Sequence, residues 1–263
     1  MRVVSLHADV LLVTSTIWQT NCVIVRGRVA PDPENPVRAN PVHPAASDPE
    51  NPVRVRIAGE GEPGAETFVI DSPVLPEELD ALPALLQQAG FPAPSGLLAT
   101  HADWDHLLGR LAFPEAALGC AVSTAQRLSA EPGAAQRELR AFDRQFYVER
   151  QRPLSLGAIQ ALDVPGQCEI GEHELQLHPA DGHTEDGMAV WLDWARVLVV
   201  GDYLSAVEEP QVDGSAAAYL ATLERLRPMV ELAEYVVPGH GPALPAERAL
   251  ELLEEARVFV AVM

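Results

Sequence analysis

The stretch Thr100-His101-Ala102-Asp103-Trp104-Asp105-His106 decides how this chain is interpreted, and it directly follows the apolar run Gly96-Leu97-Leu98-Ala99. It places two imidazoles and two carboxylates within a few positions, at the end of an expected buried strand. A polar turn with merely solvated charges is the alternative explanation. So dense a group of ligating side chains favours a metal site instead.

The geometry of extended backbone supports the metal interpretation. Alternate side chains of a strand project to the same side, so His101, Asp103 and Asp105 can converge. His106 joins them as the chain turns into a helix. Neutral imidazoles and carboxylates are good ligands for zinc, manganese and iron. Four such groups exceed what one small ion takes from a single loop, which indicates two ions.

Three later apolar segments are each followed by a histidine or an aspartate that comes directly after a glycine. The segments are residues 175–177, 196–200 and 235–237, and the polar residues after them are His183, Asp202 and His240. Glycine lets the backbone turn sharply and approach other groups closely. Each potential ligand therefore lies just beyond an expected strand, as His101 does.

These motifs and their order resemble the metallo-β-lactamase superfamily over nearly the whole chain. Members typically carry a His-x-His-x-Asp-His loop, then Gly-His-Thr, Gly-Asp and Gly-His. The residues that keep this order here are His101, Asp105, His106, His183, Asp202 and His240. The resemblance implies an α/β fold, a four-layer αββα sandwich of two mixed β-sheets with helices on the outer faces. It also implies a single domain over residues 1–263.

The same resemblance implies two divalent metal ions, with zinc the commonest occupant. The implied ligands are His101, Asp103 and His183 for the first ion, Asp105, His106 and His240 for the second, and Asp202 as the bridge between them. A hydroxide held between the ions would attack a small ester, lactone or thioester. Asp105 would orient that hydroxide, and a metal-bound water or Asp105 would return a proton to the leaving group.

The sequence departs from the family pattern at two positions. Asp103 stands where members usually have their second histidine, so we expect a less electrophilic first site and a shift towards manganese or iron. Asp186 stands where many members have glycine. It could accept a hydrogen bond behind the ligands or lie on the surface, and the surface position is favoured.

Three other functions stay open. A phosphodiesterase uses the same type of centre. Di-iron oxygen reductases of the superfamily resemble this chain in having a carboxylate at the position of Asp103, but they carry a flavin domain for which this chain has no room. A ligand-binding relative without catalysis is the third alternative.

Charge and composition narrow the partners. The formal net charge is -20, and all 18 basic residues are arginine. This argues against nucleic acid, whose phosphates attract clustered basic residues. The chain shows neither a signal peptide nor an apolar run long enough for a bilayer, so we expect a cytoplasmic protein without a membrane partner. Its three cysteines have no paired spacing and are expected to be reduced. A small-molecule substrate is expected, and a homodimer is left open.

Two insertions are expected within the domain. Residues 31–66 are rich in proline and contain one heptapeptide twice, from Asp32 to Arg38 and from Asp48 to Arg54. This composition predicts an exposed extended insertion, with partner docking as the alternative. Residues 125–160 resemble a helical lid, with a helix expected over residues 134–152. Two further helices are expected, over residues 215–226 and 245–260.

Further candidates lie around the predicted centre. Arg140 and Arg144 fall on one stripe of the expected lid helix and could contact an anionic substrate, although a solvated face is the alternative. Tyr203 follows a ligand and could contact the substrate or simply pack in the core. Asp71 ends a strand and could orient a ligand histidine or cap a turn.

Overall fold

The computed structural model describes residues 1–28, 54–55 and 64–263. Within these ranges the chain forms a 7-stranded sheet in the order β1-β2-β3-β5-β6-β7-β8 and a 6-stranded sheet in the order β13-β12-β11-β10-β9-β4. The strands of the first sheet are β1 (Arg2–His7), β2 (Val10–Thr14), β3 (Asn21–Arg28), β5 (Ala65–Asp71), β6 (Gly96–Ala99), β7 (Ala117–Ala121) and β8 (Ile159–Leu162). Those of the second are β4 (Arg54–Val55), β9 (Gly166–Ile170), β10 (His173–Pro179), β11 (Met188–Leu192), β12 (Val197–Val199) and β13 (Tyr235–Val237).

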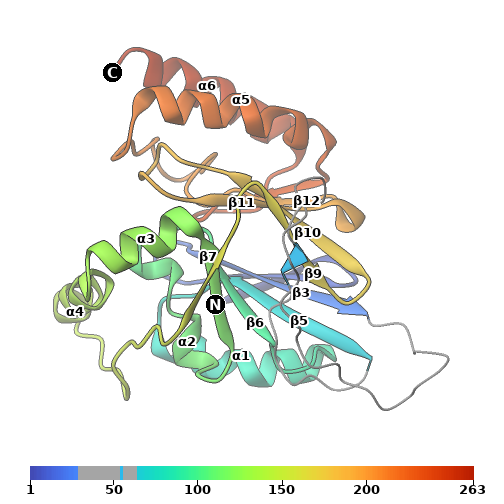
Figure 1. Cartoon of the computed structure of the whole chain (residues 1–263), viewed down its shortest axis with the longest axis vertical. Helices are drawn as coiled ribbons and strands as arrows, with labels where there is room; N and C mark the ends of the chain where they lie inside the picture. The colour runs from blue at the N-terminus through green and yellow to red at the C-terminus, as the bar shows by residue number, and fades with distance from the viewer. Residues whose placement is uncertain (29–53, 56–63) are drawn as a thin grey trace.

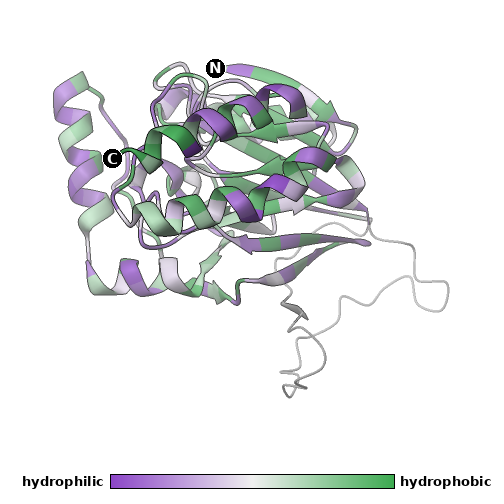
Figure 2. Ribbon diagram, turned by 90° about the horizontal axis from the view of Figure 1, so that it is seen from above, coloured by the Kyte–Doolittle hydropathy of each residue, from purple (hydrophilic) through white to green (hydrophobic). Residues whose placement is uncertain are grey.

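Helices cover the outer faces of the two sheets, which lie face to face (Figure 1). The helices are α1 (Pro76–Ala89), α2 (Gly109–Ala112), α3 (Val122–Ala130), α4 (Ala134–Phe146), α5 (Ala216–Leu232) and α6 (Ala246–Ala261), with short 3-10 turns η1 (Trp104–His106) and η2 (Asp193–Ala195). Helices α5 and α6 lie over the second sheet. In Figure 2 they carry hydrophilic residues towards the viewer, above largely hydrophobic strands. The predicted four-layer αββα sandwich is confirmed.

Strand periodicity explains why there are three hydrophobic cores. In β3, Val23 lies in the core between the sheets, whereas Ile24 lies in the core shared with α1. In β12, Val197 and Val199 lie between the sheets, whereas Leu198 packs with the residues of α5 and α6. Successive strand side chains point to opposite faces, so strands that are apolar at every position are covered on both faces.

Strand direction brings the polar motifs to one edge of the sandwich. Strands β5, β6 and β7 are parallel neighbours, so their carboxyl ends meet at the same edge of the first sheet. In the second sheet β12 is parallel to β13, and two antiparallel pairings give β10 the same direction as β12. Every segment that carries a predicted ligand leaves one of these strands.

Two helices differ in length from the sequence expectation. The helix expected over residues 134–152 ends at Phe146, because Tyr147 adopts a left-handed φ of 56° and the Val148 amide donates to the Asp143 carbonyl. In contrast, α5 continues past the expected end at Leu226 to Leu232, through an internal proline. The helix expected from Pro245 is confirmed as α6.

Most of the predicted insertion 31–66 lies outside the described residues. Of its residues, Arg54–Val55 forms β4, which pairs in parallel with β9 at the edge of the second sheet, and Ala65 and Glu66 begin β5. Among the helices that the structure describes, none combines the length and the hydropathy needed to cross a membrane.

Candidate metal centre

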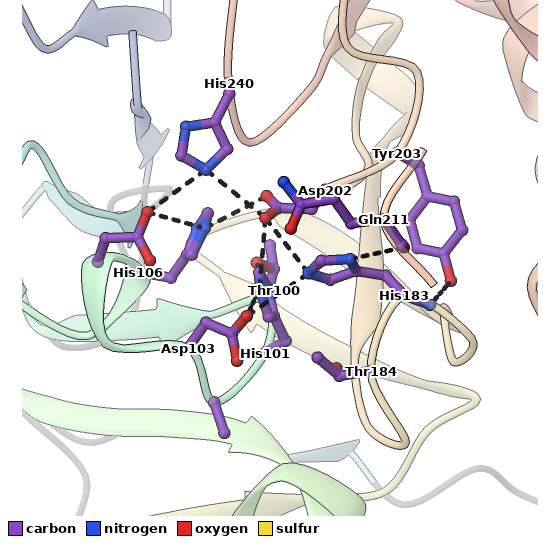
Figure 3. A network of polar contacts seen from close by, with 12 residues as sticks. Thr100, His101, Asp103, His106, His183, Thr184, Asp202, Tyr203, Gln211 and His240 are labelled. Atoms are coloured by element: carbon purple, nitrogen blue, oxygen red, sulfur yellow. Dashed lines mark hydrogen bonds and ion pairs between the residues drawn. The ribbon is translucent and has the colours of Figure 1, made fainter. Parts of the chain in front are cut away.

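The structure brings all seven predicted ligands together at the shared edge of the two sheets (Figure 3). Asp202 lies at the middle, and the Nε2 atoms of four histidines face its carboxylate. The distances to an Asp202 oxygen are 3.7 Å for His101, 3.2 Å for His106, 3.4 Å for His183 and 3.5 Å for His240. Residues from both sheets therefore share one buried polar cluster.

Two triads divide this cluster as the sequence predicts. Ligand atoms of His101, Asp103 and His183 lie within 4.8 Å of one another, and so do those of Asp105, His106 and His240. Within them, Asp103 Oδ2 is 3.5 Å from Nε2 of both His101 and His183, and Asp105 Oδ2 is 3.3 Å from His240 Nε2.

The chemistry and spacing of these atoms fit metal ions. Nε2 of His101, His106 and His183 and Oδ1 of Asp202 are buried and have no hydrogen-bond partner. Buried polar atoms without partners are costly and need an explanation. Two ligands at about 2.1 Å from one tetrahedral ion lie roughly 3.4 Å apart, which matches the separations within the cluster.

Each histidine directs its other nitrogen away from the centre, to an acceptor. Nδ1 lies 3.0 Å from the Gln211 carbonyl in His183 and 3.1 Å from the Trp18 carbonyl in His240. A carbonyl can only accept, so these Nδ1 atoms carry a proton, and Nε2 is the nitrogen left to bind a metal. The first of these contacts is drawn in Figure 3.

Asp71 accepts hydrogen bonds in the same way from the candidate metal-binding loop, residues 100–106. Its Oδ2 lies 3.1 Å from Nδ1 of His106 and accepts from the Thr100 hydroxyl at 2.9 Å, while Oδ1 accepts from the Thr100 amide at 2.8 Å. Because its hydrogen goes to Asp71, Thr100 Oγ1 is left to accept from Nδ1 of His101 at 3.0 Å. Of the two roles expected for Asp71, this contact with His106 favours orientation of a histidine over capping of a turn.

The mutual proximity of acids and imidazoles shifts their pKa values. Burial raises the pKa of Asp202, but the charges of His106 and His101 outweigh burial and hold this pKa well below its ordinary value. Burial lowers the pKa of His240, but hydrogen bonds with Asp105 and Asp202 raise it to about 10. The ligand set is therefore strongly electrostatically coupled before any ion binds.

Asp186 corrects a sequence expectation, because it is buried at 2% exposure and does not lie on the surface. Its Oδ2 accepts from the Ala102 amide at 2.9 Å, inside the metal-binding loop, and its Oδ1 accepts from the Thr184 hydroxyl and from Arg127, both at 2.8 Å. A buried carboxylate needs such donors. Asp186 thus ties the loop after β6 to the loop after β10.

Sequence reasoning missed Arg127 altogether. Its guanidinium lies 2.8 Å from Asp103 and 2.8 Å from Asp186. Arg127 belongs to α3, which begins where β7 ends, and β7 is the parallel neighbour of β6. Only this strand order, which periodicity cannot reveal, places α3 beside the metal-binding loop.

The Tyr203 hydroxyl is buried among backbone groups, which favours packing in the core over the expected contact with a substrate. The side chain is 2% exposed, and its hydroxyl donates to the Asp181 carbonyl at 2.7 Å and accepts from the His183 amide at 2.9 Å. Tyr203 therefore packs in the core, as the alternative held, and supports the loop that carries His183.

Helix α4 packs on the metal-binding loop through aromatic residues. Phe142 lies 4.9 Å from Trp104 and 5.0 Å from Trp18, measured between ring centroids. Arg140 and Arg144 are exposed on the same helix, and neither lines the cavity beside the centre. Their predicted contact with an anionic substrate has no support from this placement.

A single glycine allows the two sheets to meet at the centre. A Cβ atom on Gly239 would lie 2.0 Å from Oδ1 of Asp202 and 2.9 Å from Cε1 of His106. Both contacts are far below van der Waals distance. The residue before His240 must therefore lack a side chain.

Comparison with known proteins places this architecture in a family. The family model of the metallo-beta-lactamase superfamily matches residues 62–240. A metallo-beta-lactamase family protein from Thermus thermophilus has a TM-score of 0.66 and 18% identity, with 98% of this chain and 81% of that one covered. A metallo-beta-lactamase from Pontibacter korlensis has a TM-score of 0.60 and 15% identity, with 96% and 98% covered.

A third solved structure, a beta-lactamase domain protein from Burkholderia ambifaria, has a TM-score of 0.62 and 14% identity, with 97% of this chain and 72% of that one covered. Identities this low establish a common fold only. The family model covers most of the chain, from before β5 to His240. This chain belongs to the metallo-beta-lactamase superfamily.

Proposed function

We propose that this protein is a dinuclear metal-dependent hydrolase that acts on a small ester, lactone or thioester. The observation that carries the proposal is the convergence of four histidine Nε2 atoms on Asp202, three of them buried without a hydrogen-bond partner. In this proposal His101, Asp103 and His183 would hold the first ion, Asp105, His106 and His240 would hold the second, and Asp202 would be shared between them.

The residues of this chain bind and orient, and the ions supply the reactivity. When bound, two divalent ions supply a hydroxide nucleophile near neutral pH and stabilise the charge that develops on the attacked group. Asp105 is 7% exposed and lies between His106 and His240, where it can orient the nucleophile and hold its proton. That proton then passes to the leaving group, so ester and water give acid and alcohol.

Metal removal and replacement of the bridging carboxylate test the proposal. Protein treated with a chelator and reloaded with zinc should regain hydrolysis of neutral p-nitrophenyl esters, thioesters or lactones. Asp202→Asn should lose bound metal and at least about 100-fold of the rate together. Asp80→Asn, an exposed carboxylate on α1, is the matched control and should retain both.

Several outcomes would contradict the proposal. Hydrolysis that survives chelation, or that persists in Asp202→Asn, removes the metal mechanism. Exclusive cleavage of bis(p-nitrophenyl) phosphate would make the protein a phosphodiesterase. Bound iron with oxygen consumption and no hydrolysis would make it a redox enzyme.

The identity of the metal is part of the same proposal. Zinc is the expected occupant, and the oxygen ligand of Asp103 favours manganese or iron at the first position. Protein purified without added metal should therefore contain manganese or iron beside zinc, and Asp103→His should shift its content towards zinc. Zinc alone in both proteins, with equal turnover, would contradict the effect assigned to Asp103.

A further inference from the structure

A cavity of about 210 Å³ adjoins the metal centre, and the proposed reaction leaves its occupant unnamed. His183 and Asp202 form part of its wall, so a bound molecule would contact the centre directly. His183 is 4% exposed, and its buried Nε2 has no hydrogen-bond partner. Figure 3 shows this ring between Asp202 and Gln211, and both of these residues also line the cavity.

One side of the cavity is apolar. It is formed by the loop after β12 and by α5 and α6, through the side chains of Leu204, Tyr219, Leu252, Ala256 and Phe259. A chemical group of the size of a water molecule takes up about 30 Å³, so the cavity has room for roughly seven groups of that size. The cavity therefore fits a short hydrocarbon chain or a small ring.

Apart from His183, the ionisable side chains that line the cavity are all acidic. Glu208, Glu209 and Glu255 line the cavity, and no arginine does. Arg248 pairs with Glu255 at 3.0 Å. Glu208 lies 4.0 Å from Nδ1 of His240, and within the described part of the chain no arginine lies at ion-pair distance from Glu208 or Glu209.

These two glutamates determine the local sign of charge once the centre is loaded. Two divalent ions with three carboxylates and a hydroxide carry no net charge, so the centre itself no longer attracts an anion from a distance. The chain's overall charge of -20 has the same sign as the cavity. An anionic group that enters the cavity is repelled, and a cationic group is attracted.

We infer that this protein acts on small esters, thioesters or lactones whose apolar part enters this cavity without a negative charge, and that it favours a cationic group there over an anionic one. The inference rests on the hydrolysis proposed above and names its substrate class. Because such a substrate carries no negative charge in the cavity, it would not need a contact with the exposed arginines of α4.

Three substrates that differ only in end group test the inference. Thioesters with acyl chains of equal length, ending in methyl, trimethylammonium or carboxylate, are compared on zinc-loaded protein. The anionic substrate should have a kcat/KM at least about tenfold below that of the cationic one. In the Glu208→Gln, Glu209→Gln double variant this ratio should shrink about tenfold, whereas Glu149→Gln, an exposed glutamate outside the cavity, should leave it unaltered.

Equal rates for the three end groups, or an unaltered ratio in the double variant, would overturn the inference and leave the proposed hydrolysis intact. A binding measurement covers the other case, in which the proposed hydrolysis fails but the cavity assignment can still be tested. If no ester is cleaved, calorimetric titration with hexyltrimethylammonium and with hexanesulfonate still reports on the cavity. Binding of the cation alone, weakened in the double variant, supports the cavity assignment and contradicts hydrolysis, whereas no preference for the cation overturns the inference.

Discussion

Arg127 holds one oxygen of Asp103 and leaves the other for the metal centre. Nη2 of Arg127 is 2.8 Å from Oδ1, whereas Oδ2 faces Nε2 of His101 and of His183 at 3.5 Å each. Burial raises the pKa of Asp103, but the close imidazoles of His101 and His183 and the charge of Arg127 hold this pKa well below its ordinary value. Asp103 is thus kept ionised and presents one oxygen to the cluster.

Removing Arg127 should weaken the first metal site selectively. In Arg127→Gln, Asp103 can rotate and both its oxygens compete for the ion, so zinc affinity at this site should fall about tenfold or more. Competition titration with a chromophoric chelator should then resolve one weakened and one unaltered site. Arg257→Gln, which breaks a surface ion pair with Glu254, should alter neither. Two unaltered sites in Arg127→Gln would show that Asp103 needs no such support.

Replacing Asp71 should weaken the other site. The carboxylate of Asp71 accepts from Nδ1 of His106 and from Thr100. Asp71→Asn replaces one of its two oxygens with an NH2 group, which donates, so the imidazole loses its orientation. We expect zinc affinity at the site of His106 to fall about 10-fold to 100-fold, measured by the same competition. Because Asp71 acts through His106, a Co²⁺ absorption spectrum should also change. An unaltered spectrum and affinity would leave Asp71 a purely structural role.

The convergence of the seven side chains could be predicted from the sequence because each of them belongs to a local motif. A polar residue next to glycine at the end of an apolar strand can be recognised without knowing which strands are neighbours, as at Asp202 and His240. Parallel strand direction then suffices to bring such ends to one edge.

The supporting residues could not be predicted in the same way, because their roles depend on long-range pairing. Asp186 looked like a surface residue in the sequence, since nothing there links it to Arg127 on a helix of the other sheet. Tyr203 lies next to a ligand in sequence, yet its hydroxyl points to Asp181 behind the loop. Adjacent side chains point in different directions, so proximity in sequence did not indicate contact with a substrate.

Metal loading should release protons near neutral pH. In the metal-free protein burial lowers the pKa values of His106 and His240, but the neighbouring carboxylates outweigh it and raise them, to about 10 for His240. In their charged form these imidazoles stabilise the folded protein. This stabilisation is fully present below the ordinary pKa of histidine and is lost as the pH rises through the raised pKa values. Zinc requires neutral imidazoles, so it must displace these protons.

Calorimetry can count the protons released. The apparent binding enthalpy at about pH 7 should vary with the ionisation enthalpy of the buffer, and affinity should fall as pH is lowered from about 8 to about 6. A binding enthalpy that is the same in all buffers would mean that the metal-free histidines are already neutral.

The three cysteines should be unreactive in the folded protein. The thiols of Cys22, Cys120 and Cys168 are fully buried. Burial raises the pKa of Cys120 to about 12, with a further contribution from Asp186, and burial also raises that of Cys22. Since the thiolate is the reactive form, Ellman's reagent at about pH 8 should detect no thiol in native protein and all three after unfolding. Rapid reaction of a native thiol would contradict this burial.

The central claim is that one cluster of seven side chains holds two ions. Anomalous diffraction from crystals of the zinc-loaded protein tests it most directly. The account predicts two peaks, one bound by His101, Asp103 and His183, the other by Asp105, His106 and His240, with Asp202 between them. A single peak at full zinc loading, or a second peak away from these residues, would contradict it.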